Sequence, residues 1–123
     1  IIDIFLPEKK LRKQIMSIET DSTPLEDPKD WSTCNCFAIY KLLASDAEIA
    51  TMKANYENGN YGYGHAKQAL YELVISTFET QRGRYNYYMN NLEAVDDALA
   101  KGAAKAKLVA NDVLKRVRSK VGY

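Results

Sequence analysis

Apolar side chains recur every three or four residues along most of the chain, which is the spacing of one face of an α-helix. Leu11, Ile15 and Ile18 follow this spacing and predict a short amphipathic helix over residues 7–17. Its first residue is a proline, which suits the first helical turn because the missing N–H has no partner there. Residues 1–5 are predicted to form a short extended segment before this helix.

An acidic loop is predicted for residues 19–30. Pro24 and Pro28 interrupt any helix in this stretch. Its charged residues are one lysine, Lys29, and five acids, namely Glu19, Asp21, Glu26, Asp27 and Asp30.

Helical spacing returns at Cys36 and continues through Tyr40 and Leu43. Ser45 and Glu48 have the spacing of a capping box, in which each side chain accepts a hydrogen bond from a free backbone N–H of the other residue. A new helix is therefore predicted to begin at Ser45, with its buried side formed by Ile49, Met52 and Tyr56.

Two long helices are predicted after a glycine-rich turn at residues 58–64. The first covers residues 65–89, and its stripe is Ala66, Leu70, Val74, Phe78, Gln81, Tyr85 and Tyr88. The second covers residues 92–121 with Asn91 as its N-cap, and its stripe is Val95, Leu99, Gly102, Ala106, Val109, Val113 and Val117. The fold class predicted is an all-α helical bundle of about five helices, in one domain over residues 1–123.

The composition narrows the class of protein. The 123 residues carry a net charge of +1, with 27% charged and 46% hydrophobic residues, a balance typical of a globular domain. No run of about 18 apolar residues is present, so no membrane span is expected. Two cysteines do not make a disulfide framework, which favours a cytoplasmic protein. Because the chain opens with Ile1, we expect a piece of a longer protein.

Positive charge is concentrated at the two ends of the chain. Residues 99–123 carry seven cations against one acid, Asp112, a local balance of +6. Cations neutralise phosphates and aromatic rings stack on unpaired bases, so this region is a candidate RNA-binding surface. The predicted contacts to the RNA backbone are Lys101, Lys105, Lys107, Lys115, Arg116 and Arg118, and weaker candidates for base contacts are Arg82, Arg84, Tyr87 and Tyr88. Alternatively, the cations complement the helix dipole and form a solvated face, and Tyr85 and Tyr88 belong to the core.

Three other groups of residues favour structural roles. The Gly62–Lys67 segment lacks the spacing of a phosphate-binding loop and is interpreted as a turn. Cys34 and Cys36 supply too few ligands for a closed zinc site and are interpreted as reduced, core thiols. His65 has no recognisable catalytic partners and lies at a helix start, where a capping role is common. No catalytic or metal residue is therefore assigned.

Four segments of the chain carry a resemblance to one protein family. Residues 60–70, which read Asn-Tyr-Gly-Tyr-Gly-His-Ala-Lys-Gln-Ala-Leu, are similar to the Gly-Tyr-Gly-x-x-Lys-x-x-Leu segment of bacterial tryptophanyl-tRNA synthetases. Residues 34–42 resemble its Cys-Asn-x-Phe stretch, and Arg84-Tyr85-Asn86 with residues 102–122 are similar to its last two helices. The match covers essentially the whole chain in order.

The resemblance implies a C-terminal, anticodon-binding region that follows the family's Lys-Met-Ser-Lys-Ser loop. The family enzyme activates tryptophan with ATP and Mg²⁺ and then esterifies its tRNA, usually as a homodimer formed through the catalytic domains. By this resemblance, the partners are tRNA(Trp) and the enzyme's own catalytic domain, whereas these residues alone would be inactive and bind no cofactor. The rival class is a protein-interaction adaptor whose Ala/Val stripe docks a partner helix, and a free-standing enzyme is the weakest alternative.

Overall fold

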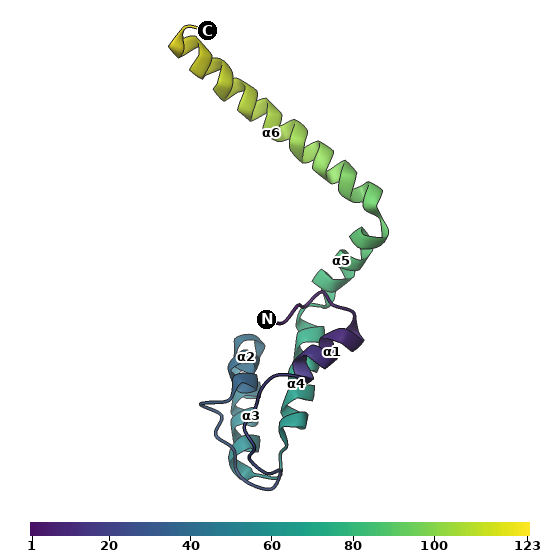
Figure 1. Ribbon diagram of the computed structural model, residues 1–123, viewed down its shortest axis with the longest axis vertical. Helices are drawn as coiled ribbons and strands as arrows, with labels where there is room; N and C mark the ends of the chain where they lie inside the picture. The colour runs from purple at the N-terminus through teal and green to yellow at the C-terminus, as the bar shows by residue number, and fades with distance from the viewer. The chain divides into compact units, whose positions relative to one another are not determined.

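The computed structural model describes residues 1–123 and contains six helices and no strand, which confirms the all-α prediction. The helices are α1 (Glu8–Met16), α2 (Asn35–Leu43), α3 (Asp46–Asn58), α4 (Tyr63–Thr77), α5 (Glu79–Asn90) and α6 (Leu92–Val121) (Figure 1). Contacts within the chain define two compact units, unit 1 (Ile1–Arg82) and unit 2 (Gly83–Tyr123). The assignment of the whole chain to one anticodon-binding domain stays a prediction.

The number of helices is six rather than about five because the helix predicted over residues 65–89 is two helices. Phe78 adopts φ −106° and ψ 19°, which ends α4, and α5 begins at the next residue. Phe78 is also the last residue of the predicted stripe that packs on the core. Beyond it, α5 has no buried residue, so no packing holds the two halves in one continuous helix.

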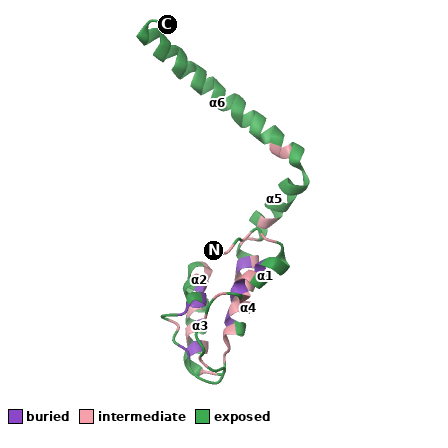
Figure 2. Cartoon of the chain, viewed as in Figure 1, coloured by how far each residue is buried: buried purple, intermediate pink, exposed green.

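The core of unit 1 lies between α1, α2, α3 and α4, and purple buried positions are confined to this unit (Figure 2). The predicted apolar stripes form this core. One cluster of buried side chains contains Leu11 and Ile15 of α1 together with Ala66, Leu70 and Val74 of α4. Tyr56 is fully buried, with its ring centroid 5.9 Å from that of Phe37. The capping box at Ser45 is confirmed by hydrogen bonds of 2.8 and 3.3 Å with Glu48.

The acidic loop is organised by its single lysine. Lys29 is 4% exposed, and its Nζ donates to the carbonyl oxygens of Pro24, Leu25 and Asp27 at 3.0 to 3.2 Å. The same ammonium lies 5.5 Å from the centroid of the Tyr63 ring. All three N–H donors are therefore satisfied by groups of the loop itself, as a buried ammonium requires.

The glycine-rich turn packs directly against this loop. Gly59 has φ 74°, and a Cβ at this position would lie 2.5 Å from the carbonyl oxygen of Glu26. The backbone N–H of Asn60 donates to that same oxygen at 3.3 Å. The turn is confirmed for residues 59–62, and glycine is required at residue 59 by both its backbone angle and the close approach. The rest of the predicted turn is wrong, because α4 begins at Tyr63, so Tyr63, Gly64 and the segment up to Lys67 are helical.

The last residue of unit 1 is hydrogen-bonded to the N-terminal segment of the same unit. Arg82 Nη1 donates to the backbone carbonyl oxygens of Ile4 and Leu6, the second at 2.8 Å. The N-terminal segment is thereby fixed to the start of α5. No helix of the structure is both long enough and apolar enough to span a lipid bilayer.

Candidate nucleic-acid interface

Helix α6 has the bounds predicted from its sequence. Alanine-rich composition favours a helix, and Gly122 ends it in the left-handed conformation with φ 90°, where Tyr123 N–H donates to Arg118 O at 2.8 Å. Asn91 occupies the N-cap position, but its side chain makes no capping bond and donates instead to Tyr87 O. The predicted side-chain cap at Asn91 is therefore wrong.

The six predicted backbone contacts on α6 do not lie in one row. Each residue of an α-helix is turned by about 100° from the one before it. This geometry places four cations within one sector of the helix surface, which we call the basic face, and the other two at the opposite border of the apolar stripe. The basic face consists of Lys101, Lys105, Lys115 and Arg116, and the other two are Lys107 and Arg118.

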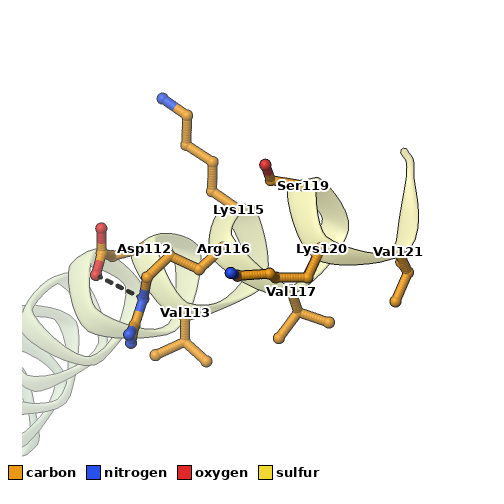
Figure 3. Close-up of a pocket in the computed structure, with 8 residues that line it drawn as sticks. All are labelled: Asp112, Val113, Lys115, Arg116, Val117, Ser119, Lys120 and Val121. Atoms are coloured by element: carbon orange, nitrogen blue, oxygen red, sulfur yellow. Dashed lines mark ion pairs between the residues drawn. The ribbon is translucent and has the colours of Figure 1, made fainter.

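All of these cations are exposed to solvent. Figure 3 shows Lys115 projecting to the side of the helix opposite Val113 and Val117. Arg116 Nε lies 3.6 Å from Asp112 Oδ2, one helical turn earlier, and both side chains are more than 70% exposed. A surface pair of this kind contributes at most about 1 kcal/mol, and the single acid, Asp112, leaves the basic face with a net positive charge.

The apolar stripe of α6 is exposed from Leu99 onward, and only its first residue, Val95, is half-buried. Leu99 is 66% exposed, Val109 67% and Val117 51%. The stripe was predicted as the buried side of a bundle helix, but within unit 2 no element covers it. Gly102 has open space around the position of a Cβ.

Helix α5 brings one cation and two tyrosines together. Arg84 precedes Tyr87 and Tyr88 by three and four residues, so the three side chains lie on one side of the helix. The two tyrosine rings meet edge to face, with centroids 5.3 Å apart. Tyr85 and Tyr88 are 39% and 45% exposed, which contradicts the interpretation of these two residues as core. The exposed rings of Tyr87 and Tyr88 present apolar faces of the kind that stack on other flat rings.

Arg82 differs from the other predicted contacts. It belongs to unit 1, and its guanidinium holds the backbone carbonyls of Ile4 and Leu6. Its structural role is therefore clear, and its proposed base contact would compete with these two hydrogen bonds. No pattern in the sequence indicates this anchor, because its partners are backbone atoms more than seventy residues away.

His65, Cys34 and Cys36, which are interpreted as structural residues, make contacts within the fold of unit 1. His65 Nδ1 accepts a hydrogen bond from the Gly62 N–H at 3.2 Å, so the ring caps α4. Cys34 and Cys36 are free and buried, and burial raises the pKa of the Cys36 thiol to about 12. Cys34 Sγ lies 3.3 Å from the hydroxyl of Tyr56. No three His, Cys, Asp or Glu side chains are grouped so that they would hold a metal ion.

Comparison with known proteins finds similarity to one class of enzyme, the aminoacyl-tRNA synthetases. No family model matches the chain. The chain is 43% identical to the tryptophan–tRNA ligase of Campylobacter jejuni over 121 residues, which is 98% of this chain and 38% of that protein. The enzymes of Rhodopirellula baltica and Fusobacterium nucleatum are 42% and 38% identical over the same length.

Solved structures give the same result. The crystal structure of tryptophanyl-tRNA synthetase from Campylobacter jejuni complexed with ADP and tryptophan matches 99% of this chain with a TM-score of 0.93 and 43% identity, and 38% of that chain is covered. The chain is homologous to the C-terminal region of bacterial tryptophan–tRNA ligases, and the predicted resemblance is confirmed. It spans less than two fifths of the relatives it matches.

Proposed function

We propose that this chain is the tRNA-binding C-terminal region of a tryptophan–tRNA ligase. The observation that carries the proposal is the exposed basic face of α6, whose four cations outnumber the one acid paired with them, Asp112. Clustered cations in such excess bind phosphates and release counterions. The relatives' names support tRNA as the nucleic acid. Anticodon recognition would be the specific task of the region.

Two surfaces of unit 2 would contribute differently. Lys101, Lys105, Lys115 and Arg116 would hold the RNA backbone without reading its sequence. Arg84 with Tyr87 and Tyr88 would contact unpaired bases by stacking, which suits the splayed bases of an RNA loop. Lys107 and Arg118, at the other border of the apolar stripe, would steer the RNA rather than contact the same phosphates.

The complete enzyme would activate tryptophan with ATP and Mg²⁺ and transfer it to tRNA. We propose that the part of the enzyme outside these residues forms the adenylate, and that the cytoplasm is its location. Association with that catalytic part, and dimerisation through it, belong to the same proposal. The exposed apolar stripe of α6 is the observation that favours the alternative, a helical module that binds protein and not RNA.

A salt series with the paired variant Lys115→Glu and Arg116→Glu tests the RNA role. We expect weaker tRNA binding and a smaller salt slope, because each lost phosphate contact removes about 0.7 to 0.9 from the slope of log affinity against log salt. The matched control is Lys9→Glu with Lys10→Glu, which makes the same charge change on exposed positions of α1. Equal effects of the two pairs would contradict a specific basic face.

The same variants in the intact enzyme separate RNA binding from chemistry. We expect the Lys115 and Arg116 pair to slow tRNA charging and to leave tryptophan-dependent pyrophosphate exchange nearly unchanged. The adaptor alternative predicts that neither reaction responds. Loss of pyrophosphate exchange would instead show that the pair supports the catalytic part.

A further inference from the structure

A cavity in unit 1 lies outside the surfaces assigned above. Its volume is about 340 Å³, at the lower end of the range of small-ligand sites. Helix α3 forms one wall, and the other lining residues are Tyr40 of α2, Tyr61 of the glycine-rich turn and Ala69 of α4. Burial raises the pKa of both tyrosines, so they stay protonated at neutral pH. Glu48 is therefore the one charged residue of the lining.

Helix α3 contributes a row of oxygen acceptors to this cavity. Glu48, Thr51 and Asn55 are separated by three and four residues, so they lie on one stripe of the helix. Glu48 Oε2 accepts the N–H of Ser45 at 2.8 Å, which holds the carboxylate and leaves Oε1 as a further acceptor. Thr51 Oγ1 donates to the Ala47 carbonyl oxygen at 3.0 Å. Because its one proton is used there, the Thr51 hydroxyl can only accept a hydrogen bond from a ligand.

The two ends of this row differ in charge. Glu48 and Asn55 are seven residues apart, which is about 10 Å along the helix axis. The charge of Glu48 adds to burial in raising the pKa of Tyr40, so the carboxylate lies near this phenol. At the other end, the Asn55 side chain is hydrogen-bonded to the hydroxyl of Tyr61. The surface between the ends is apolar, since Met52 is 4% exposed. The cavity therefore suits an elongated ligand with one positively charged end.

We propose that this cavity binds the side chain of an arginine residue from a protein partner. A guanidinium has five N–H donors and no acceptor, which matches a lining of acceptors with one negative charge. The guanidinium pairs with Glu48 and donates to Thr51 Oγ1. The methylene stem lies along Met52 and Ala69, as the stems of arginine side chains do on apolar surfaces. The backbone amide of the arginine residue then reaches Asn55.

The single charge of the cavity separates this ligand from two others. An RNA phosphate is repelled by Glu48, and no cation of the lining attracts it. A free polyamine carries several positive charges, and all but one of them would lack a partner here. The site is therefore independent of the proposed RNA-binding function.

An NMR titration of the 123-residue chain tests the proposal with two probes of the same shape. N-acetyl-arginine methylamide carries the guanidinium, whereas N-acetyl-citrulline methylamide has a neutral urea with an oxygen in place of one nitrogen. We expect the arginine probe to bind about tenfold more tightly, because hydrogen bonds to a charged group are stronger than neutral ones and the urea oxygen is repelled by the carboxylate. The backbone amide signals of Thr51, Asn55 and Tyr61 should shift.

Two pairs of variants locate the binding. Ala69→Leu fills the cavity, and Ala50→Leu makes the same change on an exposed position of α3 outside it. We expect the first to abolish the shifts and the second to leave them intact. Glu48→Gln keeps the capping box, since glutamine also serves there, and it should bind the two probes equally. Its control, Asp46→Asn, removes a carboxylate from the same turn outside the cavity and should keep the tenfold preference.

Three outcomes would overturn the proposal. The first is equal binding of the arginine and citrulline probes by the unmodified chain. The second is an unchanged preference for arginine in Glu48→Gln, which remains decisive if Ala69→Leu does not fold. The third is tighter binding of spermidine than of the arginine probe at the same amide signals, which would show that the ligand is a free polyamine. None of these outcomes depends on tRNA binding, so the proposed function stands or fails separately.

Discussion

Substitution of Gly59 by alanine should destabilise unit 1 strongly. The residue has φ 74° and ψ −176°, a region that is essentially restricted to glycine and costs other residues about 1–3 kcal/mol. The added Cβ would also lie 2.5 Å from the carbonyl oxygen of Glu26. That oxygen belongs to backbone, so relief requires movement of the acidic loop. We expect a total loss of about 2–4 kcal/mol, a large fraction of the stability of a typical domain.

Urea unfolding followed by tryptophan fluorescence measures this loss. The chain has one tryptophan, and Trp31 lies in unit 1 with its ring centroid 5.4 Å from that of Phe37. Its fluorescence therefore reports the unfolding of this unit. With an m-value of about 1–2 kcal/mol/M, the midpoint should fall by about 1 M or more.

Gly64→Ala is the matched control. A Cβ at residue 64 has nothing within 4 Å, and the residue lies inside α4. Alanine should be neutral or stabilise the unit by up to about 1 kcal/mol. The reasoning would be refuted if Gly59→Ala changed the midpoint no more than Gly64→Ala does, or if both lowered it equally.

Three further predictions concern groups of unit 1. Hydrogen bonds from Thr23 and Tyr63 lower the pKa of Asp21 to about 2. The stabilisation from this depressed pKa is present above about pH 4 and is lost as the pH falls through about 2. Tyr63→Phe should therefore raise the pKa of Asp21, as measured by carboxyl NMR. Because burial raises the pKa of Cys36 to about 12, iodoacetamide should modify it slowly in the folded chain at pH 8 and much faster in urea. Lys29→Met leaves three carbonyl oxygens without their donor, and thermal unfolding should show a loss of about 1–3 kcal/mol.

Local patterns in the sequence predicted much of the fold. The bounds of α6 and the capping box at Ser45 were both correct, because they depend on residues a few positions apart. The break at Phe78 was missed, since helical spacing continues through it and only the end of the core interrupts the helix.

Contacts between distant segments account for what the sequence did not predict. Lys29 was assigned to a loop, and nothing in its neighbours indicated a buried ammonium held by carbonyl oxygens. The cavity beside Tyr40 and Tyr61 joins four segments, so no local motif marks it. By contrast, the charge pattern of α6 and its division into a basic face and a separate pair need only the continuous helix over Leu92–Val121, which local spacing predicts correctly.

The anchor at Arg82 has a mechanical consequence for unit 1. One guanidinium holds both carbonyls near the start of the unit and itself belongs to the last residue of that unit. A force that separates the two ends therefore loads these two hydrogen bonds together with the bond from the Asp3 N–H to Gln14 and the packing of Ile2, Ile4 and Leu6 on the core. Loss of the Arg82 side chain alone would leave the N-terminal segment tethered by those remaining contacts.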